Sequence, residues 1–147
     1  MIRSSKGFTL VELVITIVLV GILVGSTIPT FTKLTQKSQI TVNKANMTII
    51  KNAFLQYFYD NHIKGNPEFP TEPEDNLLSE EYRDVFLSDG RRVNMLFNGD
   101  MPLNSNNNPF FYEHTFDTTN GYITRGFIIK DIDESSPSYE DAVVAEI

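Results

Sequence analysis

The sequence contains no cysteine and no tryptophan, and it has only two histidines among its 147 residues. The lack of cysteine excludes disulfide bonds, cysteine-ligated zinc and thiol nucleophiles. It does not identify the compartment, because it shows only that the fold does not depend on oxidation. The histidines, His62 and His114, are isolated and show no metal-ligand spacing.

Charge is almost absent from the first part of the chain. Between Lys6 and Lys33 there is one charged residue, Glu12, in an otherwise apolar run. A membrane-spanning helix needs roughly 20 apolar residues, and this run is long enough. A carboxylate deep in hydrocarbon costs on the order of 2.5–3.5 kcal/mol on insertion scales. We therefore expect Glu12 to be functional and to require a partner.

The rest of the chain is long enough for one small soluble domain. The formal net charge is −7, and loss of Arg3 and Lys6 would leave −9. An acidic body is a poor general binder of nucleic acid, because affinity for phosphates comes mainly from Lys and Arg. No nucleophile elbow, P-loop or dinucleotide fingerprint occurs, so the sequence predicts neither an enzyme nor a cofactor.

The N-terminus does not fit a cleaved secretory signal peptide. Residues 1–7 are short and basic, but the apolar run is too long, and no Ala-x-Ala-like site follows it. Hydropathy alone predicts an uncleaved single-pass anchor. Gly21 and Gly25 form a small-xxx-small pair that permits close helix approach. Pro29 lacks the N–H that would bond the Gly25 carbonyl, so we expect a helix kink near Pro29.

Residues 6–31, which begin KGFTLVELVITIVLVGIL, resemble the N-terminus of type IV pilin and pseudopilin precursors. That family has a short basic leader ending in Gly, then Phe-Thr-Leu-x-Glu and an apolar helix. The resemblance implies cleavage by prepilin peptidase between Gly7 and Phe8, and N-methylation of Phe8. It also implies that Glu12 pairs with the N-terminal amine of a neighbouring subunit. The pairing is physically reasonable, because each buried charge is costly until the two meet.

The resemblance implies an α+β, type IV pilin-like fold. We expect a leader at 1–7, a transmembrane and filament-core helix at 8–31, an amphipathic continuation at 32–62, and a head at 63–147 with a small antiparallel sheet. A helix over 8–60 would be about 80 Å long. Local melting between Gly21 and Pro29 during assembly is a further hypothesis from the family. The amphipathic continuation has an apolar stripe at Phe31, Leu34, Ser38, Val42, Ala45, Ile49 and Ala53, which widens at Ile50, Phe54, Leu55, Tyr57 and Phe58.

The head combines predicted helix, strands and turns. The helix should stop between residues 61 and 67, where Asn, Gly and Pro gather. We expect a short helix at 77–89 and a strand at 91–100. The strongest strand pair is 110–116 with 122–132, joined by the turn-forming residues 117–121. The tail from 142 to 147 could add an edge strand or stay mobile.

Metal binding is the weaker alternative in the head. The resemblance matters here because some pseudopilins stabilise a C-terminal loop with calcium, whereas many major pilins use a disulfide. The calcium candidates, which offer hard oxygen ligands, are Asp117, Asp131, Asp133 and Glu134. Their spacing does not fit an EF-hand, and a solvated acidic loop is the preferred interpretation. No metal is predicted.

The predicted function is assembly into a type IV pilus-like filament. The implied partners are copies of the chain and other pilins, prepilin peptidase, and an inner-membrane assembly platform with its ATPase. The implied locations are the inner membrane before assembly, and the cell surface or periplasm after it. The alternatives are a pseudopilin of type II secretion, a competence pilin that contacts DNA through Arg91-Arg92, and an anchored binding module that never polymerises.

Overall fold

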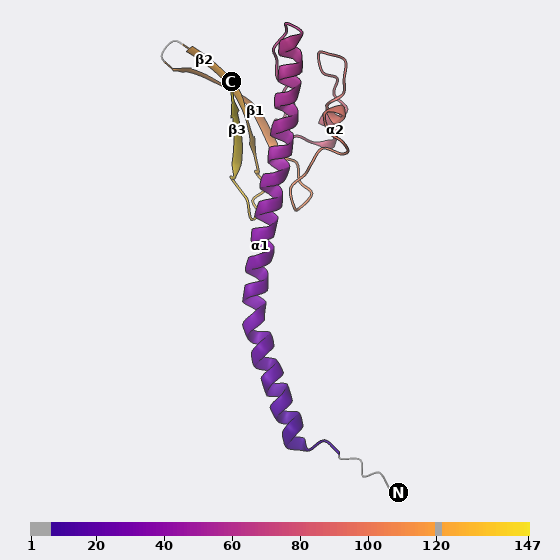
Figure 1. The fold of residues 1–147 in the computed structure, drawn as a ribbon, viewed down its shortest axis with the longest axis vertical. Coiled ribbons are helices and arrows are strands. Elements are labelled where there is room, and N and C mark those ends of the chain that lie inside the picture. Colours follow the sequence, from indigo (N-terminus) through magenta and orange to yellow (C-terminus); the bar gives the residue numbers. More distant parts are fainter. Residues whose placement is uncertain (1–6, 120–121) are drawn as a thin grey trace. The chain divides into compact units, whose positions relative to one another are not determined.

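The computed structural model describes residues 7–119 and 122–147, and side chains for these except 117–119 and 122–123. The architecture is α+β and pilin-like, with a long N-terminal helix and a small three-stranded antiparallel sheet (Figure 1). The chain divides into two compact units, residues 1–37 and residues 38–147. Each unit is described by itself below.

In the first unit, helix α1 (Leu10–Ile63) begins, and every described side chain up to Lys37 is exposed. The helix is long enough and apolar enough to cross a membrane. Five of its hydroxyl groups donate to a carbonyl three or four residues earlier; these belong to Thr16, Ser26, Thr27, Thr32 and Thr35. A helix that is apolar all round and satisfies most of its hydroxyl groups internally suits a hydrocarbon environment.

In the second unit, α1 buries a face different from the predicted stripe. Its buried residues are Asn43, Met47, Ile50, Phe54, Tyr57, Phe58 and Asn61. Val42 and Ile49, which belong to the apolar stripe that the sequence shows, are 47% and 50% exposed. This segment of α1 is therefore apolar on two faces, and the face with Met47, Ile50 and Phe54 packs in the core. The predicted widening of the apolar face is confirmed at Ile50 and Phe54.

Helix α1 ends where the sequence predicts. The backbone N–H of Gly65 donates to the His62 carbonyl and that of Asn66 to the Asn61 carbonyl, each at 3.0 Å. Gly65 has φ of +88°, in the left-handed region that favours glycine. This is a common way to satisfy the last carbonyls of a helix, and it turns the chain toward the head.

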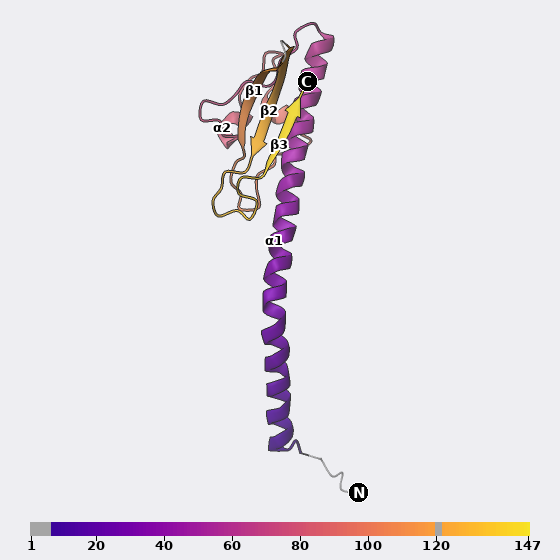
Figure 2. The same ribbon diagram turned by 90° about the vertical axis from the view of Figure 1, so that its left-hand side faces the viewer.

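The sheet contains β1 (Phe111–Thr119), β2 (Tyr122–Lys130) and β3 (Ala142–Glu146), in that order (Figure 2). The β1–β2 pairing is antiparallel from Phe111–Lys130 to Thr119–Tyr122, which confirms the predicted strand pair. The turn predicted at 117–121 begins too early, because β1 continues to Thr119 and its ladder with β2 extends to that residue; residues 120 and 121 lie outside those described. The tail forms β3 on the edge, so the edge-strand alternative is confirmed.

The core of the second unit lies between α1 and the sheet. The ring of Phe54 is central to it, with ring-centroid distances of 4.9 Å to Tyr112, 5.9 Å to Phe127 and 6.2 Å to Phe97. Rings tilted at such separations pack favourably beyond the area they bury. The other fully buried side chains of the core include Met47, Ile50, Leu78, Val93, Phe110 and Ile129. The helix therefore forms one wall of the head.

Two predictions of secondary structure between α1 and β1 were wrong. The helix expected at 77–89 is only one turn, α2 (Glu80–Arg83), and the strand expected at 91–100 is a 3₁₀ turn, η1 (Val93–Leu96). After α2 the chain reverses tightly: the N–H of Leu87 donates to the Arg91 carbonyl, and the N–H of Val93 donates to the Val85 carbonyl. The backbone N–H and carbonyl groups of this reversal bond each other, so they are not available for the hydrogen bonds of a longer helix.

Candidate functional site

The predicted processing site lies outside the helix. Gly7 and Phe8 precede Leu10, the first residue of α1, and have no regular secondary structure. Phe8 is 75% exposed. The Gly7–Phe8 peptide bond is therefore free of helical hydrogen bonds, and helix α1 does not have to unwind for this bond to enter a peptidase.

Glu12 lies in a capping box at the start of α1. The N–H of Thr9 donates to Glu12 Oε2 at 2.9 Å, and the N–H of Glu12 donates to Thr9 Oγ1 at 3.2 Å. This reciprocal arrangement satisfies two N–H groups that the first turn of a helix leaves unpaired. The sequence carries the signal for it, Thr-x-x-Glu before an apolar run, and our sequence interpretation missed it.

The cap changes what is expected of Glu12. The Thr9 hydroxyl also donates to Glu12 Oε2 at 2.8 Å, so the carboxylate has two donors within its own chain. Both hydrogen bonds end on Oε2, which leaves Oε1 for a further donor. Hydrogen bonds lower the cost of a carboxylate in an apolar setting without supplying the opposite charge that would neutralise it.

Gly21, Gly25 and Pro29 lie in continuous helix in the first unit. A Cβ built on either glycine would meet nothing within 4 Å. The packing of this chain alone therefore does not require glycine at these positions. Close contact with another helix at Gly21 and Gly25, a kink at Pro29, and local melting during assembly stay predictions.

A buried polar cluster ties the C-terminal loop to α1 in the second unit. We call it the polar clasp, and it consists of Asn43, Asn104, Asp131, Ser136 and Ser138. The Asn43 amide donates to Ser138 Oγ at 2.6 Å and to Ser136 Oγ at 3.1 Å, and it lies 3.3 Å from Asp131 Oδ2. Asn43 and Asp131 are fully buried. The clasp fixes the loop between β2 and β3 without a covalent bond.

The carboxylates of this loop are held by N–H and O–H donors. Burial alone would raise the pKa of Asp131, but hydrogen bonds from Ser136, Ser138 and Asn104 outweigh it and lower that pKa. The pKa of Asp133 lies far below its ordinary value, because Ser135 and the Asn108, Asn106 and Asn104 amides donate to its carboxylate. These contacts stabilise the ionised forms.

The calcium candidates do not converge on one point in the part of the chain that the structure describes. No group of three or more His, Cys, Asp or Glu residues there is placed to hold a metal ion. Glu134 is exposed, and the side chain of Asp117 lies outside the described set. Asp131 and Asp133 have the hydrogen-bond donors named above as partners.

The Arg91-Arg92 pair contacts acidic side chains of its own head. Arg91 Nε lies 2.7 Å from Asp89 Oδ2 and Arg91 Nη2 lies 3.7 Å from Asp60 Oδ2. Arg92 Nη1 lies 2.9 Å from Asp84 Oδ1. These contacts compete with any phosphate for the two guanidinium groups, which weakens the DNA-contact alternative.

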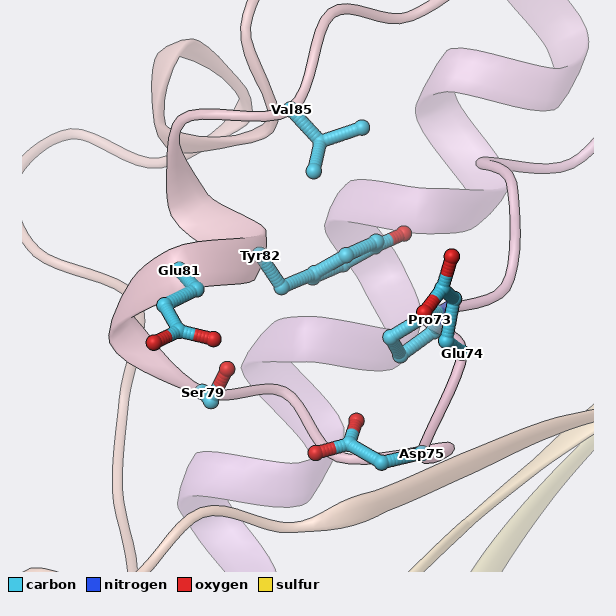
Figure 3. Close-up of a pocket in the computed structure, with 7 residues that line it drawn as sticks. All are labelled: Pro73, Glu74, Asp75, Ser79, Glu81, Tyr82 and Val85. Carbon is cyan, nitrogen blue, oxygen red and sulfur yellow. The ribbon is translucent and has the colours of Figure 1, made fainter.

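Beside α2 the surface of the second unit has an acidic hollow of about 360 Å³ (Figure 3). Glu74, Asp75 and Glu81 line the hollow together with Tyr82, which is 3% exposed. Burial raises the pKa of Tyr82 well above the ordinary value. No Lys, Arg or His lines the hollow, and its carboxylates would repel an anion.

Comparison with known proteins places the N-terminal segment in a defined class. Residues 2–28 match the model of the prokaryotic N-terminal methylation motif. No curated protein and no solved structure matches the chain. The motif is typical of structural proteins rather than enzymes, and it implies processing by prepilin peptidase and assembly with other pilins. The matched segment includes the junction Gly7–Phe8, the capped Glu12 and most of the apolar helix, so the chain carries the type IV prepilin signature at its N-terminus.

Proposed function

We propose that the chain is a structural subunit of a type IV pilus-like filament. Prepilin peptidase removes residues 1–7, and the new amine of Phe8 is methylated. The subunit remains in the inner membrane until an assembly platform and its ATPase extract it. It then becomes part of a filament that contains further copies of this chain and related pilins. There Glu12 pairs with the Phe8 amine of a neighbouring subunit.

One observation carries this proposal. The methylation motif at residues 2–28 introduces a helix whose described side chains up to Lys37 are all exposed. Apolar surface on this scale is not stable in water and needs lipid or other protein around it. A membrane before assembly and neighbouring helices afterwards would each provide that environment.

The second face of α1 in the head supports bundling. Val42, Ala45 and Ile49 are exposed and follow helical spacing, on a face other than the one packed against the sheet. A helix that serves only as a wall of its own head needs one apolar face. A second apolar face fits contact with helices of neighbouring subunits.

A pseudopilin of type II secretion is the second candidate, because the methylation motif occurs in both kinds of precursor. The amount of the protein in sheared surface filaments separates the two. An abundant band supports a pilin, whereas absence from the filaments supports a pseudopilin that stays in the periplasm.

Mass spectrometry of the mature N-terminus tests the processing step. We expect a chain that begins at Phe8 and carries one extra methyl group on its amine. Retention of MIRSSKG would contradict the proposal and favour a permanent anchor that never polymerises.

The capping box makes a sharper test of Glu12. Glu12→Gln keeps the hydrogen-bond acceptor of the cap but removes the charge, whereas Thr9→Ala weakens the cap and keeps the charge. We expect Glu12→Gln and Glu12→Ala to insert in the membrane but fail to enter filaments beside wild-type subunits. Thr9→Ala should still enter. If Thr9→Ala fails and Glu12→Gln enters normally, Glu12 acts through the cap and the docking role is wrong.

A further inference from the structure

The inner face of the sheet continues beyond the core. β3 pairs with β2 only from Gly126 to Lys130, while the β1–β2 pairing extends to Thr119 and Tyr122. Tyr112 and Phe127 on this face are fully buried. Farther along β1, His114 is partly exposed and Phe116 is 71% exposed. The hairpin therefore exposes aromatic side chains of the kind that fill the core.

These side chains line a cleft of about 450 Å³ between the hairpin, the end of α1 and the loop that follows it. That volume lies in the range of small-molecule sites, about 300–1,000 Å³. We call it the aromatic cleft and define it by Glu68, Phe69, Glu72, His114, Phe116 and Arg125. All of them belong to the second unit.

The rings of the cleft form a connected row. The ring centroids of Phe69 and His114 are 5.7 Å apart, and those of His114 and Phe116 are 6.5 Å apart. Phe69 is stacked on Phe58 at 4.7 Å, which anchors the row to α1. Phe116, at the far end, is the most exposed ring of the row. A row anchored at one end and open at the other provides a rigid surface on which a flat apolar face can stack.

Hydrogen-bonding groups of both kinds border the rings. Glu72 accepts from the backbone N–H of His114, and Glu72 Oε1 lies 3.7 Å from His114 Nδ1. Glu68 Oε1 lies 3.5 Å from the Tyr57 hydroxyl. Arg125 is directly opposite Phe116 in the strand register and supplies donors. The two carboxylates are thus held by their own chain in the wall of the cleft that Phe116 also lines.

We infer that the aromatic cleft binds a neutral saccharide. The C–H groups on one face of a sugar ring carry partial positive charge and stack on the negative face of an aromatic ring. The sugar hydroxyls both donate and accept, so they match the carboxylates and the guanidinium together. This inference goes beyond filament assembly and does not depend on it.

The charges of the cleft exclude the competing ligand classes. Its two carboxylates, in a unit whose formal charge is −10, repel a polyanion such as nucleic acid. A proline-rich peptide also docks on aromatic grooves, but its carbonyls need donors, and two of the cleft's polar groups are acceptors. The acidic hollow beside α2 offers no comparable surface, because its one ring is buried.

The test uses the full chain in micelles of lauryldimethylamine oxide, a detergent without a sugar headgroup. Calorimetric titration compares cellohexaose and chitohexaose with a hyaluronan hexasaccharide and a proline decapeptide. We expect saturable binding of at least one neutral hexasaccharide. Phe116→Ala should weaken it by about tenfold, which corresponds to roughly 1.4 kcal/mol. Arg125→Gln should weaken it in the same direction.

Phe86→Ala provides the matched control. Phe86 is also exposed, at 65%, and also lies beside an arginine, since Arg92 Cζ is 5.1 Å from its ring centroid. It lies outside the cleft, so its loss should leave affinity unchanged. The inference is overturned if neither neutral hexasaccharide binds, if hyaluronan or the peptide binds more tightly, or if Phe116→Ala and Phe86→Ala behave alike.

Discussion

The two units of the chain differ in the exposure of their side chains and in their formal charge. In residues 7–37 every described side chain is exposed, whereas residues 38–147 bury a core around Phe54. The formal charge differs as well: four basic residues and one acidic residue give +3 to residues 1–37 and leave −10 for residues 38–147. The first unit depends on its surroundings for stability, and the second depends on itself.

One helix serves both units. Leu10–Ile63 is continuous, yet its side chains up to Lys37 are exposed, whereas its later part forms a wall of the head. Helix α1 therefore forms both where its side chains are exposed and where they pack in a core. Substitutions along α1 can show which of its residues contribute to the unfolding free energy of the head.

The largest expected effect comes from removing the central ring of the core. Phe54→Ala should lower the unfolding free energy of the head by about 3–5 kcal/mol, because it leaves a cavity among Tyr112, Phe127 and Phe97. Urea denaturation followed by tyrosine fluorescence measures this, since all six tyrosines lie in residues 38–147.

Phe31→Ala is the matched control on the same helix. Phe31 is 74% exposed, so its loss should change the unfolding free energy of the head by less than about 0.5 kcal/mol. Equal losses from the two substitutions would show that the stability of the head depends on the first unit, and the contrast between the units would fail.

A smaller loss is expected at the polar clasp. Asn43→Ala removes the buried amide that donates to Ser136 and Ser138, which should cost about 1–3 kcal/mol in the same urea experiment. Val42→Ala, one residue earlier and 47% exposed, should cost less than about 0.5 kcal/mol. If the two variants are equally stable, the clasp does not contribute to the stability of the head.

At the start of α1 the expected effect is local. Thr9→Ala removes the capping hydroxyl and should cost about 1 kcal/mol of helix stability. Hydrogen exchange in micelles should become faster at residues 10–13, while the head stays protected. Faster exchange throughout the head would mean that the two units unfold together.

The smallest expected effect is the acid sensitivity that Asp133 gives to the head, because this carboxylate is partly exposed and screened by water. Its pKa in the folded chain is below the ordinary value of about 3.9, so its contribution is complete above that pH and is lost as pH falls below it. The melting temperature should therefore drop below about pH 4. In Asp133→Asn the drop should be shallower, and an unchanged pH profile would contradict this role.

The sequence predicted well wherever one signal dominated. The methylation motif, the membrane-length apolar run, the strand pair and the helix stop near Gly65 all have strong local patterns. The sequence did not predict which apolar face of α1 packs, because Val42 and Ile49 lie on one face and Met47 and Ile50 on another. Periodicity locates apolar faces but does not say which one meets the sheet.

The contacts that sequence patterns missed are of two kinds. The capping box of Thr9 and Glu12 was readable from their spacing and was overlooked because the acid had another explanation. The polar clasp was not readable, since Asn43 lies 88 to 95 positions from its partners Asp131, Ser136 and Ser138. The short reversal at residues 85–93 likewise depends on tertiary context rather than on helix propensity.

The sequence separation within the polar clasp sets an order of folding. Asn43 is synthesised early, but its partners at 131–138 come with the last part of the chain. Contacts of such high sequence separation form late and slow the completion of a fold. The head is therefore incomplete until nearly the whole chain has been made, and a chain truncated before residue 131 lacks both the clasp and β3.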